Sequence, residues 1–293
     1  MRLSFATSQL GHRWSNLIRP TRVLLGLGRA CHPGPTFVVT LAVTALAASL
    51  GRTGLGVVAV AIAVLLGQLS VGWSNDALDA DRDRAADRSD KPIVAGLVSA
   101  RTVRIAASAA AVLCIPMSFI AAGRIGGSAH VVAVASAWIY NVWLKKTVFS
   151  PLPYVVSFAL VAPFITYGLD PSTPPALWFI ATLACLGLAA GMANGIPDID
   201  SDRGVSIGGL VARLGARSSA VISAIGVVAA TVLLVPRLQL STTLSVAIVL
   251  VAVAVVVAGA LAASGRHLFR VVMLLALVDT ALLCALDVSA VVR

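Results

Sequence analysis

Long uninterrupted runs of apolar residues constrain this chain more than any other feature. A helix of about twenty such residues crosses the hydrocarbon core of a bilayer, and the sequence contains nine runs near that length. Their approximate ranges are 36–50, 54–74, 101–121, 128–144, 152–168, 176–197, 216–235, 242–263 and 268–286. The sequence therefore predicts an all-α, polytopic membrane protein, a bundle of about nine transmembrane helices around a central cavity.

The low charge content excludes an ordinary soluble protein. Charged residues make up 12% of the chain, whereas soluble globular domains carry roughly a quarter. We expect two regions, a basic cytosolic or interfacial N-terminal segment (1–35) and a nine-helix transmembrane domain (36–293). The four cysteines and four histidines have no metal-ligand spacing, so we assign them no role in the site.

The distribution of basic residues predicts the orientation. Of the 22 lysines and arginines, 18 fall on the side of the membrane that carries the N-terminus, and 4 fall on the other side. Cytosolic connections are enriched in lysine and arginine. We therefore expect a multi-pass protein of the inner (plasma) membrane, with its N-terminus and its charged connections in the cytosol.

The acidic residues are all aspartates, and nine of the 12 lie in two clusters. The first cluster follows the second apolar run and begins with Asn75 and Asp76. If the helix continues there, Asp76, Asp79 and Asp83 share one face. Like charges on one face repel unless a cation lies among them, and carboxylate and amide oxygens suit Mg²⁺. The pattern predicts a magnesium site.

The second cluster follows the sixth run and repeats this spacing. Asn194, Asp198 and Asp202 are four residues apart and are followed by Arg203. One such cluster alone is typical of solvated loop charges, but two with helical spacing at the same membrane face favour a binding site. Because Mg²⁺ usually shares its ligand shell with substrate phosphates, we expect a diphosphate or phosphate ester at the cytosolic mouth of the bundle.

These motifs resemble those of one enzyme family. Asn75-Asp76-x-x-Asp79-x-x-x-Asp83, followed by Asp87-Arg88-x-x-Lys91-Pro92 and Gly96-x-x-Ser99, resembles the first Asp-rich motif of the UbiA-type intramembrane prenyltransferases. Asp198-x-x-x-Asp202-Arg203 with Arg213-Leu214-Gly215 resembles the second motif, and Tyr140 with Lys145 and Lys146 resembles the Tyr/Lys loop. The chain departs from the family pattern at Lys91, where the family has arginine, and at Asn194, where many members have aspartate.

The resemblance implies an enzyme that transfers a polyprenyl group from a prenyl diphosphate to a small acceptor, usually an electron-rich aromatic ring. It implies two Mg²⁺ ions, the first bound by Asn75, Asp76, Asp79 and Asp83, and the second bound by Asp198 and Asp202, with Asn194 as a further candidate. Candidate cations for the diphosphate are Arg88, Lys91, Lys145 and Arg203. Tyr140 would stabilise an allylic carbocation, although aromatic residues near an interface are also typical membrane anchors. The expected partners are the donor, the acceptor and the bilayer, and no nucleic acid.

Two other functions remain as alternatives. Some relatives of this family transfer a phosphoribosyl group to a polyprenyl phosphate, and motif spacing does not separate that reaction from prenyl transfer. An ion-coupled transporter would place carboxylates near the bilayer midplane, whereas these clusters lie at one face. Asp279, inside the last run, must face the protein interior, either as a structural hydrogen-bond partner or in the acceptor pocket.

Overall fold

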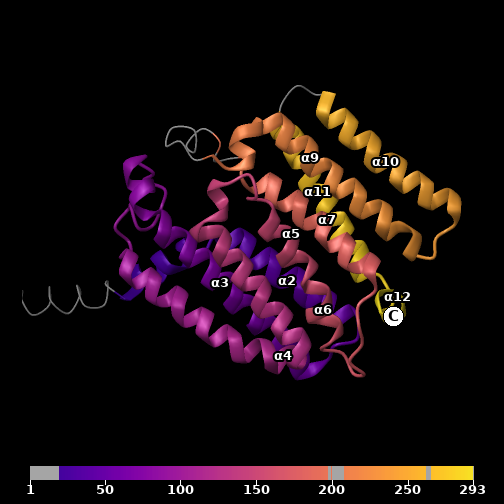
Figure 1. Ribbon diagram of the computed structural model, residues 1–293, viewed down its shortest axis with the longest axis horizontal. Helices are drawn as coiled ribbons and strands as arrows, with labels where there is room; N and C mark the ends of the chain where they lie inside the picture. The colour runs from indigo at the N-terminus through magenta and orange to yellow at the C-terminus, as the bar shows by residue number, and fades with distance from the viewer. Residues whose placement is uncertain (1–19, 197–198, 200–207, 262–264, 293) are drawn as a thin grey trace, which may run out of the picture.

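The structure, a computed structural model, describes residues 20–196, 199, 208–261 and 265–292. The regular elements in these ranges are helices, so the all-α architecture is confirmed (Figure 1). They are the helix Pro20–Ala30, α2 (Pro33–Ser49), α3 (Gly54–Ala85), α4 (Ala100–Val142), η1 (Leu144–Lys146), α5 (Leu152–Ala159), α6 (Val161–Thr166), α7 (Leu177–Asn194), α9 (Leu210–Leu234), η2 (Val235–Arg237), α10 (Thr242–Leu261), α11 (Gly265–Cys284) and α12 (Val288–Val291).

The helices form one bundle with a shared apolar core. In Figure 1, α2, α3 and α4 lie on one side, α9, α10 and α11 lie on the other, and α7 lies between them. The largest buried cluster draws side chains from helices on both sides, including Phe164 of α6, Phe179 of α7 and Leu234 of α9. Many large apolar side chains are exposed on the outside of the bundle, as expected for a surface that contacts lipid.

The longest helix, α4, is a hairpin of two arms. A straight helix of its 43 residues would be about 65 Å long, roughly twice the apolar thickness of a bilayer. Ala122 and Gly123 leave helical geometry, and Gly123 has a φ of 64°, which glycine adopts without strain. The chain then folds back, because Ser118 Oγ lies 2.7 Å from His130 Nδ1. α4 therefore supplies both the third and the fourth predicted spans.

The predicted apolar runs all overlap helices in the part of the chain that is described. α3, α4, α7 and the α9–η2 stretch are each long and apolar enough to cross a bilayer, and the helix Pro20–Ala30 forms a fifth such unit with α2, bent by 65°. α5 with α6, α10 and α11 add shorter apolar segments. A multi-pass membrane fold is confirmed. The central cavity stays a prediction, and two open hollows of the described chain lie on the surface of α4.

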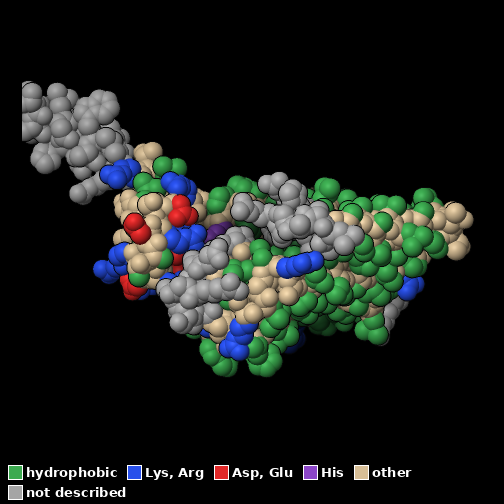
Figure 2. Space-filling view, turned by 90° about the horizontal axis from the view of Figure 1, so that it is seen from above, with side chains coloured by type: hydrophobic (Ala, Val, Ile, Leu, Met, Phe, Trp, Pro, Cys, Tyr) green, Lys and Arg blue, Asp and Glu red, His purple; other side chains and the backbone are tan. Residues whose placement is uncertain are grey.

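The helix α3 continues past its apolar run and carries the first Asp cluster. The extension, residues 75–85, is roughly 16 Å long. Its small residues Ala77 and Ala80 are buried against Ala30, Ile93 and Val98, so the helix Pro20–Ala30 and the 86–99 connection cover this end of α3. Figure 2 shows that the acidic side chains of the visible face gather at this end of the molecule, whereas apolar side chains cover the remaining length.

Candidate active site

Three carboxylates lie on one buried face of the α3 extension. Asp76, Asp79 and Asp83 are 2%, 7% and 2% exposed. The helix places them together because residues at i, i+3 and i+7 share a face. Buried carboxylates are costly unless cations or hydrogen-bond donors compensate them, so the neighbouring elements must supply such groups.

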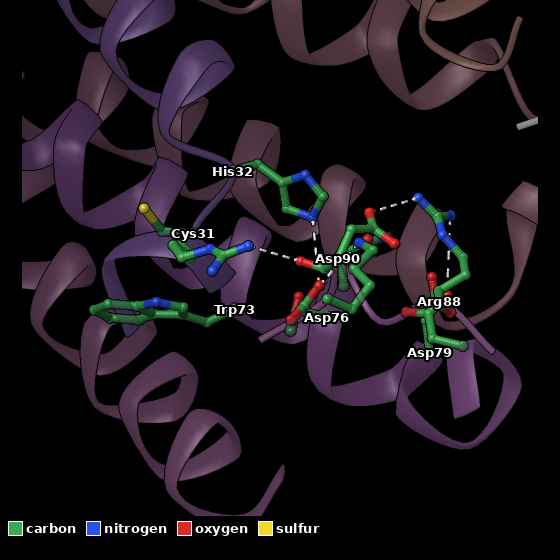
Figure 3. Close-up of polar contacts among 12 residues, drawn as sticks. Cys31, His32, Trp73, Asp76, Asp79, Arg88 and Asp90 are labelled. Atoms are coloured by element: carbon green, nitrogen blue, oxygen red, sulfur yellow. Dashed lines mark hydrogen bonds and ion pairs between the residues drawn. The ribbon is translucent and has the colours of Figure 1, made fainter. Parts of the chain in front are cut away.

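Asp76 is compensated by the connection that follows α3. Lys91 Nζ donates to Asp76 Oδ1 at 2.9 Å, and the Lys91 side chain is only 14% exposed. His32, in the turn before α2, places Nε2 3.8 Å from the same oxygen (Figure 3). The other oxygen, Oδ2, is buried and has no hydrogen-bond partner among the described residues. Asp76 therefore has one buried acceptor oxygen that no described group satisfies.

Asp79 is compensated on both oxygens. Lys145 Nζ, from η1, donates to Oδ1, and Arg82 Nη2 donates to Oδ2 at 2.8 Å. The Lys145 side chain is 9% exposed. Burial lowers the pKa of its ammonium, and the Asp79 carboxylate opposes this shift. The pair thus ties the end of α4 to the α3 extension.

Asp83 faces the 86–99 connection. Arg88 Nη1 lies 4.0 Å from Asp83 Oδ1, and its Nη2 lies 3.5 Å from Asp90 Oδ2. Arg29 Nη2 donates to the Asp90 backbone carbonyl at 3.0 Å. Arg88 is therefore close to two carboxylates, and the Arg29 contact attaches the connection to the helix Pro20–Ala30.

The Gly96-x-x-Ser99 element has a local structural role in the described chain. Gly96 has a φ of +70°, a conformation that favours glycine, and it turns the chain toward α4. Ser99 then caps α4, because its Oγ accepts from the Thr102 backbone N–H at 3.0 Å. Such caps satisfy a free amide at a helix start. These residues fix where the connection ends and so help to position Lys91.

Asn75 and Tyr140 lie where α3 meets the end of α4. Asn75 Nδ2 donates to Asn141 Oδ1 at 3.1 Å, and Asn141 in turn donates to the Ser74 hydroxyl at 2.8 Å. Tyr140 packs edge to face on Tyr154, with ring centroids 5.2 Å apart. Asn75 is thus fixed beside Asp76, and Tyr140 belongs to a ring pair between α4 and α5.

The second cluster lies mostly outside the described residues. Asp198, Asp202 and Arg203 are among the residues that are not described, whereas Asn194 is the exposed last residue of α7. The described chain resumes beside the first cluster, because Gly209 lies so close to the Lys145 carbonyl that no Cβ would fit. Leu210 N also donates to Thr147 O at 3.2 Å. The connection that carries the second cluster therefore ends at the Lys145 turn.

Comparison with known proteins gives the family. A model of the UbiA prenyltransferase family matches residues 36–285. The chain belongs to this family. UbiA members are intramembrane prenyltransferases, so the chain is an enzyme of that class. No curated protein sequence matches it significantly.

Solved structures agree with this assignment at the level of fold. A structure described as digeranylgeranylglyceryl phosphate synthase in membranes shares 14% identity and a TM-score of 0.64, over 89% of this chain and 96% of that one. An apo UbiA homologue from Aeropyrum pernix K1 shares 20% identity and a TM-score of 0.61, over 84% and 95%. A UbiA homologue from Archaeoglobus fulgidus shares 15% identity and a TM-score of 0.55, over 90% and 98%.

The UbiA family implies Mg²⁺, and the described residues fit such an ion. Asp76 Oδ2 is a buried carboxylate oxygen without a hydrogen-bond partner in the described chain, and a bound water or ion offsets the burial of such an atom. Hard oxygen donors of this kind suit Mg²⁺. Within the described ranges, no group of three or more acidic, histidine or cysteine side chains is placed to hold a metal ion.

Two residues at this UbiA site were not among the sequence-based candidates. Arg82 pairs with Asp79, and its i+3 spacing was a readable signal. His32, which was assigned no role, lies beside Asp76. No local sequence pattern links His32 to Asp76. The turn that carries His32 packs closely on α3 because Gly72 of α3 has no side chain, and a Cβ at that position would collide with the Cys31 carbonyl.

Proposed function

We propose that this UbiA-family enzyme catalyses Mg²⁺-dependent transfer of a polyprenyl group from a prenyl diphosphate to a small-molecule acceptor. The single observation that carries this proposal is the buried face of α3, where three carboxylates lie beside cations from two other segments. Asn75, Asp76, Asp79 and Asp83 would hold one ion. Asp198 and Asp202 would hold a second, with Asn194 as a further candidate.

The leaving group decides what the site must supply. When bound, the metal neutralises charge on the diphosphate, which departs from an allylic carbon only when that charge is stabilised. Arg88, Lys91, Lys145 and Arg203 would bind the diphosphate oxygens. The apolar bundle would exclude water from the allylic cation, and the ring of Tyr140 would stabilise that cation.

The acceptor remains the least constrained partner. We infer an electron-rich aromatic ring, the usual acceptor in the family, entering from the cytosolic side or the bilayer. The name of one structural neighbour, digeranylgeranylglyceryl phosphate synthase, makes a lipid-type phosphate acceptor the first alternative to test. The excess of basic residues on one side supports an orientation with the site facing the cytosol, in the inner membrane.

The test is product formation by the purified chain in nanodiscs. Labelled prenyl diphosphates of several lengths are incubated with Mg²⁺ and either aromatic acceptors or a lipid extract, and the products are identified by mass spectrometry. We expect Asp76→Asn or EDTA to lower the rate at least about a hundredfold. Asp81→Asn is the matched control, because Asp81 lies on the same helix with its side chain 99% exposed.

Two results would reject the proposal. If prenyl transfer persists in EDTA or in Asp76→Asn, the carboxylates do not serve the reaction. If phosphoribosyl diphosphate is consumed with a polyprenyl phosphate while prenyl diphosphates are not, the enzyme performs the phosphoribosyl transfer instead.

A further inference from the structure

The carboxylates that the proposed function assigns to a divalent cation already bind cations of the chain. Lys91 binds Asp76 Oδ1, and Lys145 binds Asp79 Oδ1. Each carboxylate oxygen has two lone pairs, so an ammonium group does not by itself block a metal ion, but the two positive charges repel when both contact the same carboxylate. Metal binding at Asp76 and Asp79 therefore favours displacement of each lysine.

The two lysines cannot move into water at low cost. Their side chains are 14% and 9% exposed, and both lie on short connections that are fixed at each end. Lys91 lies between α3 and the capped start of α4, and Lys145 lies in η1, which packs against Gly209. Removing the partner of a buried charge is strongly unfavourable unless another group replaces it. A lysine displaced here needs a second anion nearby.

We propose that Lys91 and Lys145 are exchangeable counter-ions, which bind Asp76 and Asp79 in the free enzyme and transfer to the diphosphate when a divalent cation occupies the carboxylates. This inference rests on the proposed function, because it takes the cation and the diphosphate as ligands. Each ligand then completes the exchange that the other requires, so the two bind cooperatively, and by linkage the coupling is reciprocal. Arg82 is not part of the exchange, because it lies on the same helix turn as Asp79 and binds the opposite oxygen.

The exchange predicts opposite effects of one substitution on two affinities. Lys145→Met removes a competitor of the metal, so the metal alone should bind more tightly. The same change removes a cation from the diphosphate, so the metal–diphosphate complex should bind more weakly. If Lys145 bound only the diphosphate, its substitution would leave the affinity for the metal alone unchanged. If Lys145 only stabilised the fold, its substitution would weaken both affinities.

The test uses the full chain in nanodiscs. Mn²⁺ binding without diphosphate is measured by electron paramagnetic resonance, and binding of Mg²⁺–pyrophosphate is measured by calorimetry. We expect Lys145→Met to tighten Mn²⁺ binding about tenfold and to weaken Mg²⁺–pyrophosphate binding by a similar factor. Lys146→Met is the matched control, because Lys146 is the exposed neighbour in η1 and should change neither affinity.

Lys91→Met is the second variant and should show the same reversal, so a folding defect in one variant does not decide the result. Unchanged or weaker Mn²⁺ binding in both variants would overturn the exchange while leaving the proposed function intact. Absence of saturable Mn²⁺ and Mg²⁺–pyrophosphate binding in the unsubstituted chain would instead overturn the proposed function, and the exchange with it.

Discussion

Replacing Asn141 with alanine is expected to loosen the contact between α3 and α4 beside the carboxylates. Asn141 is 3% exposed and makes three hydrogen bonds to α3, with Asn75 Nδ2 at 3.1 Å, Val71 O at 2.9 Å and Ser74 Oγ at 2.8 Å. Such bonds between membrane helices contribute about 0.6 kcal/mol each on average. Losing three should lower the free energy of unfolding by roughly 2 kcal/mol.

A double-mutant cycle isolates the bond to Asn75. Asn75→Ala, Asn141→Ala and the double variant are unfolded reversibly in mixed micelles with a denaturing detergent. Because the double variant loses the shared bond only once, its destabilisation should fall short of the sum of the single effects by about 0.6 kcal/mol. Additivity within about 0.3 kcal/mol would refute the contact.

The same variants separate positioning from ligand binding. Asn75 is a proposed metal ligand, whereas Asn141 acts through Asn75. Asn75→Ala should therefore weaken Mg²⁺–pyrophosphate binding more than Asn141→Ala, although it destabilises the fold less. The opposite order would contradict the role assigned to Asn75.

Three further substitutions test the local structure. Gly209→Ala places a Cβ against the Lys145 carbonyl, so the rate of prenyl transfer should fall about tenfold while unfolding in detergent remains cooperative. Arg52→Ala removes the guanidinium that donates to a backbone carbonyl at the end of the first α4 arm. This change should lower the free energy of unfolding by about 1 kcal/mol and should leave the rate of prenyl transfer per folded molecule unchanged. Ser118→Ala should lower the free energy of unfolding by a similar amount, because it breaks the hydrogen bond to His130. In a straight helix the two residues would lie about 18 Å apart, and the substitution would lower the free energy of unfolding far less.

The features predicted correctly from the sequence are those that depend on local periodicity. The apolar runs predicted the helices, because an element that crosses lipid must satisfy its own backbone. The gap between the third run, which ends at residue 121, and the fourth, which begins at residue 128, predicted a break in the chain, and the structure turns within this gap at Gly123. The shared face of Asp76, Asp79 and Asp83 also followed from helix geometry alone.

The pairing of charges could not be predicted in the same way. Lys91 lies 15 residues from its partner Asp76, and Lys145 lies 66 residues from Asp79. These contacts depend on a positive-φ glycine, on the hairpin of α4 and on the packing of Gly209, none of which helical periodicity encodes. The sequence therefore indicated Arg88, Lys91 and Lys145 as candidate cations, but not which carboxylate each one contacts.

Position 91 has a lysine where the family pattern has an arginine, and the two side chains would contact Asp76 differently. A guanidinium fork binds both oxygens of a carboxylate at once, which would occupy Oδ1 and Oδ2 of Asp76 together. The Lys91 ammonium contacts only Oδ1, and Oδ2 stays buried without a hydrogen-bond partner in the described chain. In the proposed exchange Lys91 therefore gives up a contact with one oxygen of Asp76, whereas a forked arginine would give up contacts with both.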